Sequence, residues 1–367
     1  MSLSIGIVGL PNVGKSTLFN ALTKAQNAEV ANYPFCTIEP NKAIVAVPDK
    51  RLHLLEKLLK PRKTTHAAVD FIDIAGLIRG ASKGEGLGNQ FLGNIRECAA
   101  ILHVARCFEG GDIVHVNGSI DPDRDVEIIE TELILADLQA LEKRLEKTKK
   151  IRGDKNMQNL AEELEILAEH LNSGKTASSF RGNHSDAFKQ TMLELSLLSA
   201  KPVIFCANID EAALSGDAAN PALERLKKIS LARNAEMVII CAKIEEELQG
   251  LAPDEKQEIL EYYSIAEPGL DKIIHTGYHT LGLISYFTAG EKEVRAWTIK
   301  KDWKAPQAAG VIHTDFEKGF IRVEVIAYAD YVRLGSEAAA RAAGVMRTEG
   351  REYVVQDGDV LHFLFNV

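Results

Sequence analysis

The chain has 367 residues, more than one ordinary hydrophobic core accommodates, so we expect two or three domains. Its 46% hydrophobic and 26% charged residues are typical of a globular protein, and no apolar run approaches the roughly 20 residues that cross a bilayer. A net charge of −9 argues against a protein that coats nucleic acid, although it allows a local basic patch. Five cysteines without C-x-x-C spacing predict free thiols in a reducing cytoplasm, and the first strand begins too early to leave room for a signal peptide.

The first predicted strand, residues 5–8, leads into Gly9-Leu-Pro-Asn-Val-Gly-Lys-Ser16, a complete G-x-x-x-x-G-K-S motif that opens a predicted helix. In such a loop, backbone N–H groups and the helix N-terminus surround phosphates, a lysine reaches the β- and γ-phosphates, and a serine hydroxyl ligates Mg²⁺. We therefore predict a nucleotide site with a catalytic lysine. The residues expected to bind phosphate are Asn12, Val13, Gly14, Lys15, Ser16 and Thr17.

Two further segments, one at the end of a predicted strand and one in a predicted loop, supply the other expected ligands of the magnesium site. The strand at residues 69–74 carries Asp73 near its end, and Asp73-Ile-Ala-Gly76 matches the D-x-x-G pattern, in which the aspartate holds Mg²⁺ through water and the glycine N–H senses a γ-phosphate. Before it, Thr37 stands in a predicted loop where its hydroxyl and carbonyl would reach the ion. We predict Ser16, Thr37 and Asp73 as the metal site and Gly76 as a phosphate contact.

The residue after Gly76 is Leu77, where many related enzymes carry a glutamine that orients the attacking water. Leucine cannot hydrogen-bond to water, so another group must position it. A glycine-containing loop after the strand at residues 101–105 offers His115. We predict His115 as catalytic, with an exposed or structural histidine as the alternative.

No strand is predicted between Ala105 and Pro202. Leucines and isoleucines recur there at spacings of three and four in two stretches, which predicts an antiparallel helical hairpin, followed by another helix after residues 182–186. Basic residues gather at its turn and suit a phosphate backbone, whereas the alternative is a solvated helix face. They are Lys143, Arg144, Lys147, Lys149, Lys150, Arg152 and Lys155.

The strand at residues 202–207 ends in Asn208-Ile-Asp-Glu211. GTP-specific proteins of this architecture carry N-K-x-D there, and the aspartate accepts hydrogen bonds from guanine. Ile209 and Glu211 replace the lysine and the aspartate, which argues against strict guanine specificity; in the alternative, Asp210 serves guanine after a one-residue shift. We predict Asn208, Ile209 and Glu211 as base contacts, together with Cys241 and Ala242 after the strand at residues 237–241.

Alternation of strands and helices predicts an α/β fold with a mostly parallel sheet and helices on both faces. From Leu281, short strand-like runs predict a small mixed module. The expected domains are residues 1–125 with 200–280, a helical insertion at residues 126–199, and residues 281–367.

With these motifs in place, the chain resembles the YchF/Obg-like ATPase family of P-loop NTPases along nearly its whole length. The resemblance rests on the phosphate loop, on residues 32–41 and 73–92, and on residues 305–321 and 357–363. It implies a G domain, an inserted coiled-coil hairpin and a C-terminal TGS domain of the β-grasp type. The departure from N-K-x-D is itself the family's pattern and implies that ATP is preferred over GTP.

The predicted function is therefore Mg²⁺-dependent ATP hydrolysis to ADP and phosphate by a switch protein, with K⁺ beside Asn12 as a further predicted cofactor. The resemblance implies that the hairpin and the TGS domain bind RNA or the ribosome, as the large subunit or the 70S particle. We expect a cytoplasmic monomer without a membrane partner. A GTP-specific GTPase and a nucleotide-sensing scaffold with negligible turnover are the alternatives.

Overall fold

A computed structural model describes residues 3–29, 41–74, 87–109, 119–151, 153–214 and 219–366. By its contacts the chain divides into two compact units. The first comprises residues 1–22, 40–42 and 71–270, and the second comprises residues 23–39, 43–70 and 271–367. The three domains expected above were defined by sequence patterns and not by contacts, and they remain a prediction.

The first sheet confirms the predicted α/β fold. Neighbouring strands at its centre are parallel, with Val8 opposite His103, Leu102 opposite Ile204 and Cys206 opposite Val238. All six strands were expected from their apolar, β-branched runs. Their order across the sheet is β2 (Lys42–Ala46), β4 (Ala68–Asp73), β1 (Ser4–Val8), β5 (Ala100–Arg106), β6 (Val203–Asn208) and β7 (Glu236–Ile240).

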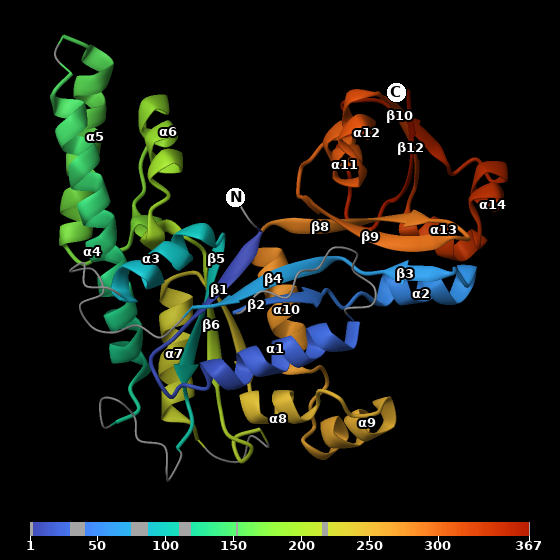
Figure 1. Cartoon of the computed structure of the whole chain (residues 1–367), viewed down its shortest axis with the longest axis horizontal. Helices are drawn as coiled ribbons and strands as arrows, with labels where there is room; N and C mark the ends of the chain where they lie inside the picture. The colour runs from blue at the N-terminus through green and yellow to red at the C-terminus, as the bar shows by residue number, and fades with distance from the viewer. Residues whose placement is uncertain are drawn as a thin grey trace. The chain divides into compact units, whose positions relative to one another are not determined.

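Helices accompany this sheet, and α1 and α7 lie on opposite sides of its central strands (Figure 1). Helix α7 begins where Asn220 accepts a hydrogen bond from Leu223 N–H and Pro221 opens the first turn. The helices between the first strands and the hairpin are α1 (Lys15–Glu29), α2 (Lys50–Leu59) and α3 (Leu87–Glu97). Those after it are α7 (Pro221–Ala232), α8 (Ala242–Glu247), α9 (Pro253–Tyr262) and α10 (Gly269–Thr280).

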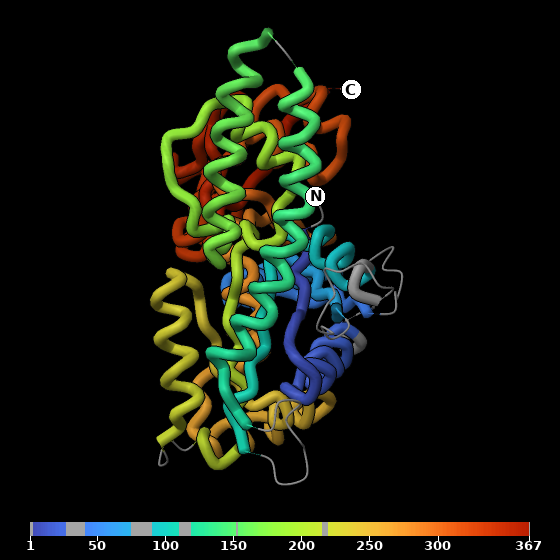
Figure 2. Tube along the Cα trace, turned by 90° about the vertical axis from the view of Figure 1, so that its left-hand side faces the viewer, coloured from blue at the N-terminus to red at the C-terminus, as the bar shows by residue number. Residues whose placement is uncertain are grey.

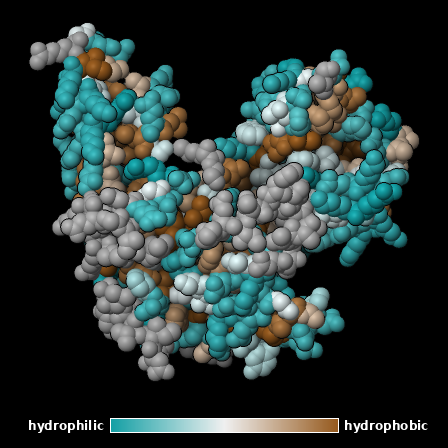
Figure 3. Space-filling view, in the orientation of Figure 1, coloured by the Kyte–Doolittle hydropathy of each residue, from teal (hydrophilic) through white to brown (hydrophobic). Residues whose placement is uncertain are grey.

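The predicted helical hairpin is present in the connection between β5 and β6. Helices α4 (Pro122–Lys149) and α5 (Lys155–Asn172) run side by side (Figures 1 and 2), and their outer faces are largely hydrophilic (Figure 3). Shorter segments follow, η3 (Ala177–Ser179), α6 (Asp186–Leu195) and η4 (Leu198–Ala200). The hydrophobic positions of the two predicted heptad patterns meet in one core: Ile134, Leu138, Leu141, Leu160, Leu164, Leu167 and Leu171.

The hairpin is tied to the chain that enters β6 by a buried carboxylate. Asp137 of α4 accepts hydrogen bonds from Leu198 N–H at 2.7 Å, from Ser199 N–H at 2.8 Å and from the Ser199 hydroxyl at 2.6 Å. Because the carboxylate is completely buried, these three donors replace the water that it loses on folding.

The C-terminal part forms a second sheet that was only partly predicted. Two three-residue strands, β3 (Lys63–Thr65) and β11 (Arg347–Glu349), were missed because they are too short to show a hydrophobic period. Its helices are α11 (Ala305–Ile312), α12 (Thr314–Lys318), α13 (Tyr328–Leu334) and α14 (Glu337–Ala342). The strand order is β11 (Arg347–Glu349), β10 (Phe320–Ile326), β12 (Val360–Phe365), β8 (Leu283–Ala289), β9 (Glu293–Lys300) and β3 (Lys63–Thr65).

Four of the five cysteines, Cys98, Cys107, Cys206 and Cys241, are free and buried, as expected, and Cys36 lies outside the described residues. Burial raises the pKa of the Cys107 thiol to about 12, so it stays protonated near neutral pH. None of the described helices combines the length and the apolar character needed to cross a membrane.

His103 of β5 makes the stability of the fold depend on pH. Burial, with the positive charge of Arg233 adding to it, lowers the pKa of His103 to about 4. Between about pH 6.5 and pH 4 the unfolded chain therefore binds a proton that the native chain does not, and the free energy of unfolding falls by up to roughly 3 kcal/mol as the pH drops.

We expect His103→Leu to remove this part of the pH dependence, as measured by urea unfolding at several pH values. The exposed His313→Ala is the matched control and should retain the wild-type slope. Equal slopes in the wild type and in His103→Leu would show that another group titrates.

Candidate functional site

A cavity of about 1380 Å³ lies where β1, β5, β6 and β7 end, the edge of a parallel sheet at which ligands bind. Of the predicted residues, Thr37, Gly76 and His115 lie outside the described part of the chain, and Val13 is buried below the cavity. The predicted residues that line it are Asn12, Gly14, Lys15, Ser16, Thr17, Asp73, Asn208, Ile209, Glu211, Cys241 and Ala242.

The phosphate loop has the backbone that its motif predicts. Asn12 and Gly14 both have positive φ, 65° and 94°, and α1 begins at the next residue, Lys15. Leu18 N–H donates to the Gly14 carbonyl at 3.0 Å, the first hydrogen bond of that helix. The loop thus directs the helix N-terminus toward the cavity, where its partial positive charge stabilises an anion.

Gly14 is also required for steric reasons. A Cβ atom at this position would overlap the Asn208 side-chain amide, and its φ is unfavourable for any L-residue. We expect Gly14→Ala to weaken nucleotide binding about fivefold or more, because one strained residue costs about 1–3 kcal/mol. Gly93→Ala, on an open face of α3, is the matched control. Equal affinity of both variants for nucleotide, in a fluorescence titration, would contradict this account.

Lys15, Ser16 and Asp73 bring the groups needed for phosphate and magnesium to one end of the cavity. The Lys15 ammonium contacts the Asp73 carboxylate directly, and both side chains are largely buried. Mg²⁺ prefers carboxylate, hydroxyl and phosphate oxygens, so the Ser16 hydroxyl and the Asp73 carboxylate are a suitable donor pair. The residues present therefore fit this ion.

Asn208 holds three loops of the site together. Its Nδ2 donates to the Val13 carbonyl at 2.9 Å, and its Oδ1 accepts from Ala242 N–H at 2.9 Å. The backbone carbonyl of Asn208 accepts a hydrogen bond from Cys107 N–H at 2.8 Å. Both side-chain amide groups are thus bonded to the protein, so Asn208 positions the phosphate loop relative to the loop after β7.

The opposite end of the cavity differs from a guanine site in its hydrogen bonds. The Glu211 carboxylate pairs with Lys243 Nζ at 2.7 Å, and Asp210 Oδ1 accepts from Ala213 N–H at 2.9 Å within its own turn. Ile209 is buried and packs into the core below β6. Each carboxylate of this segment is therefore engaged by a donor of the chain.

Phe108 and Lys243 line the cavity but were not among the predicted site residues. Phe108 follows β5, with the Arg106 guanidinium 4.5 Å above the centre of its ring, and Lys243 pairs with Glu211. Their position directly after β5 and close to β7 was the signal that could have identified them, since parallel strands end at a common edge.

Comparison with known proteins agrees with this architecture. A family model described as a 50S ribosome-binding GTPase matches residues 4–151, and the model YchF-GTPase_C, described as a protein of unknown function, matches residues 283–366. The proteins called ribosome-binding ATPase YchF in Bacillus subtilis and Escherichia coli O157:H7 are 50% and 48% identical to this chain, with 100% of both chains covered.

A solved structure, that of the Schizosaccharomyces pombe YchF GTPase, has a TM-score of 0.89 at 42% identity. It covers 99% of this chain and 98% of its own. The match extends through the α/β part, the hairpin and the C-terminal sheet, so the family resemblance inferred from the motifs is confirmed. The chain belongs to the YchF family.

Proposed function

We propose that the chain binds ATP with Mg²⁺ and hydrolyses it to ADP and phosphate. The observation that carries this proposal is the cavity in which the phosphate loop, the Asp73 carboxylate and the Asn208–Glu211 segment meet. The bacterial relatives are named ATPases, which supports the reaction. Phosphate release from ATP by the purified chain, with and without Mg²⁺, tests it; absence of turnover in both conditions would contradict it.

In this proposal, backbone N–H groups of residues 12–17 bind the phosphate oxygens, and Lys15 neutralises charge on the β- and γ-phosphates. Ser16, Asp73 and Thr37 hold Mg²⁺, which neutralises further phosphate charge when bound. Gly76 contacts the γ-phosphate. Asn208 keeps the phosphate loop in place through its hydrogen bond to Val13.

For the base we propose adenine over guanine. A guanine site needs a carboxylate that accepts hydrogen bonds from N1–H and the 2-amino group of the base. Here Lys243 competes for the oxygens of Glu211, and Asp210 accepts a hydrogen bond from Ala213 N–H. The yeast relative is called a GTPase and the bacterial relatives ATPases, so the names of relatives do not decide the question.

Competition of ATP and GTP for a fluorescent nucleotide tests the base preference. We expect ATP to compete better, and Lys243→Ala to reduce the ATP-to-GTP affinity ratio by up to about fivefold, since an exposed ion pair contributes little. Lys228→Ala, exposed on α7, should leave the ratio unchanged. Stronger competition by GTP than by ATP would instead favour the GTP-specific alternative.

We further propose His115 as the residue that positions the attacking water and Asn12 as a K⁺ ligand; both rest on the sequence motifs. Leu77 supplies no hydrogen bond to water, and an amide inside the phosphate loop suits a monovalent cation beside the phosphates. Unchanged single-turnover hydrolysis in His115→Ala would refute the first role. Equal rates in Na⁺ and K⁺ would refute the second.

We propose the ribosome or its RNA as the macromolecular partner of a cytoplasmic, monomeric protein. The predicted basic cluster supports this: Lys143, Lys147, Lys150 and Lys155 are exposed near the adjoining ends of α4 and α5. Arg144 and Lys149 instead pair with Glu194 and Glu165. We propose the C-terminal module as a second, protein-directed contact.

Co-sedimentation with 70S particles compares the wild type with a Lys143→Glu, Lys147→Glu, Lys150→Glu variant. The variant should bind more weakly and with a shallower salt dependence, because each lost phosphate contact reduces the slope. Lys256→Glu is the single-site control. Hydrolysis assays with and without ribosomes separate an activated ATPase from a scaffold with negligible turnover.

A further inference from the structure

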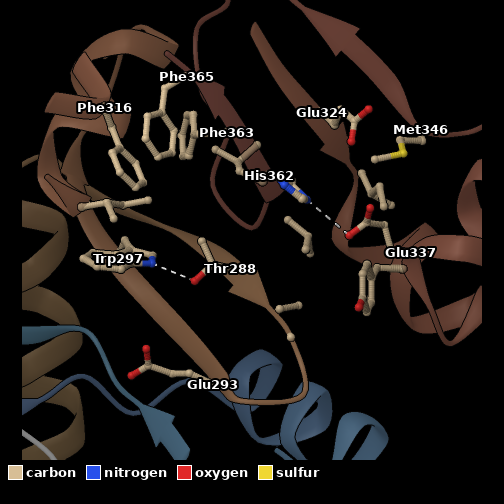
Figure 4. Close-up of a pocket in the computed structure, with 17 residues that line it drawn as sticks. Thr288, Glu293, Trp297, Phe316, Glu324, Glu337, Met346, His362, Phe363 and Phe365 are labelled. Carbon is tan, nitrogen blue, oxygen red and sulfur yellow. Dashed lines mark hydrogen bonds and ion pairs between the residues drawn. The ribbon is translucent and has the colours of Figure 1, made fainter. Parts of the chain in front are cut away.

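A second cavity, of about 410 Å³, lies in the C-terminal part against β8, β10 and β12 (Figure 4). Its two ends differ in chemistry. Trp297, Phe316, Phe363 and Phe365 gather at one end, whereas the side chains of Glu324, Glu337 and His362 gather at the other. His362 belongs to the 357–363 motif, which the nucleotide site does not use.

The backbone brings the three polar side chains together. Glu324 of β10 and His362 of β12 are directly opposite in the antiparallel register, so their side chains lie on the same face of the sheet. Glu337 is the first residue of α14, which follows the Ser336 cap. One ligand atom from each of the three residues lies within 4.8 Å of the other two.

The separation of His362 and Glu337 is closer to that of two ligands of a shared ion than to a hydrogen bond. His362 Nδ1 and Glu337 Oε2 are 3.7 Å apart, too far for a hydrogen bond. Two ligands of a tetrahedral zinc ion with bonds of about 2.0–2.1 Å are separated by roughly 3.4 Å. One imidazole nitrogen and two carboxylate oxygens also form a donor set for Zn²⁺, whereas Mg²⁺ prefers oxygen ligands throughout.

Arg341 is the competing cation. Its guanidinium donates to both oxygens of Glu324, at 3.2 and 2.9 Å, and to Glu337 Oε1 at 3.5 Å. A carboxylate oxygen has two lone pairs, and carboxylates that bind metals are commonly also hydrogen-bonded by a neighbouring residue. The Arg341 side chain is 58% exposed, so solvent screens its charge.

We propose that Glu324, Glu337 and His362 bind one Zn²⁺ ion, with the fourth coordination position directed into the 410 Å³ cavity. Three protein ligands and one open position are the arrangement of zinc sites that accept an exogenous ligand. This inference is independent of the nucleotide site and of its proposed reaction.

Calorimetric titration of the metal-free full-length chain with Zn²⁺, in excess Mg²⁺, tests the site. We expect one ion per chain, and at least about tenfold weaker binding by His362→Ala and by Glu337→Gln. The control is His53→Ala: His53 Nδ1 also lies 3.7 Å from a glutamate, Glu56, on α2. Wild-type affinity in His362→Ala, loss of binding in His53→Ala, or no binding by the wild type would each overturn the proposal.

Two further measurements separate loss of a ligand from loss of structure. Zn²⁺ should raise the melting temperature of the wild type and of His53→Ala but not of His362→Ala, whose metal-free melting should match the wild type because His362 is exposed. Arg341→Gln removes the competing charge and should bind Zn²⁺ at least as tightly as the wild type. Weakening as large as that in His362→Ala would show that these variants act through the packing of α14, which contradicts the proposal.

Discussion

Replacing Lys15 with alanine is expected to reduce the rate of ATP hydrolysis at least about a hundredfold, the effect of removing one donor aimed at developing charge in an enclosed site. Lys15 opens α1, lines the 1380 Å³ cavity and contacts the carboxylate of Asp73, so no other lysine of the described cavity lies so close to the predicted metal ligand. Phosphate release under single-turnover conditions measures the loss.

Lys57→Ala, on an exposed position of α2, is the matched control and should hydrolyse ATP at the wild-type rate. Lys15→Arg should remain impaired, because a planar guanidinium does not replace a compact ammonium between phosphates. Since Lys15→Ala also leaves Asp73 without its cation, urea unfolding should accompany the assay. An unchanged rate in a stably folded Lys15→Ala would locate hydrolysis elsewhere.

Asp137→Ala is expected to lower the free energy of unfolding by about 3 kcal/mol or more. The substitution leaves Leu198 N–H, Ser199 N–H and the Ser199 hydroxyl without their acceptor in a buried place, and each unsatisfied group costs about 1–3 kcal/mol. Urea unfolding at neutral pH measures the change.

Asp186→Ala, at the fully exposed first turn of α6, should change stability by about 0.5 kcal/mol or less and is the matched control. Ser199→Ala removes one of the three hydrogen bonds to Asp137 and also the acceptor of Ala177 N–H, and it should fall between the two, near 2 kcal/mol. Comparable stability of Asp137→Ala and Asp186→Ala would mean that water or a rearranged chain satisfies the three donors.

The sequence predicted those parts of the fold that carry a local period. The six strands of the first sheet are apolar runs, and Leu141 and Leu164 belong to heptads that meet in the hairpin core. Strand β3 was not predicted because Lys63-Thr-Thr65 has no hydrophobic pattern. It is defined by its pairing with β9, which lies more than two hundred residues away in the sequence.

In the candidate site, too, the residues of a local motif were predictable and those that meet through tertiary contacts were not. The phosphate loop is contiguous in sequence, so Gly14, Lys15 and Ser16 could be identified from the motif alone. Two other features, the ion pair of Glu211 with Lys243 and the hydrogen bonds of the Asn208 amide, join loops that follow different strands. A local sequence pattern cannot predict such contacts. Asn208 as a base contact remains a prediction, and the structure adds the hydrogen bonds of its amide to Val13 and Ala242.

Helix α4 has a mechanical consequence. With 28 residues at 1.5 Å each it is a rod about 42 Å long, anchored by Asp137 at its middle and starting thirteen residues after Glu109 of the nucleotide cavity. A tilt of about five degrees about the Asp137 anchor would displace each end by about 2 Å. Because the anchor lies near the middle, a displacement of the first turn is accompanied by one of similar size, in the opposite direction, at the far end of the helix.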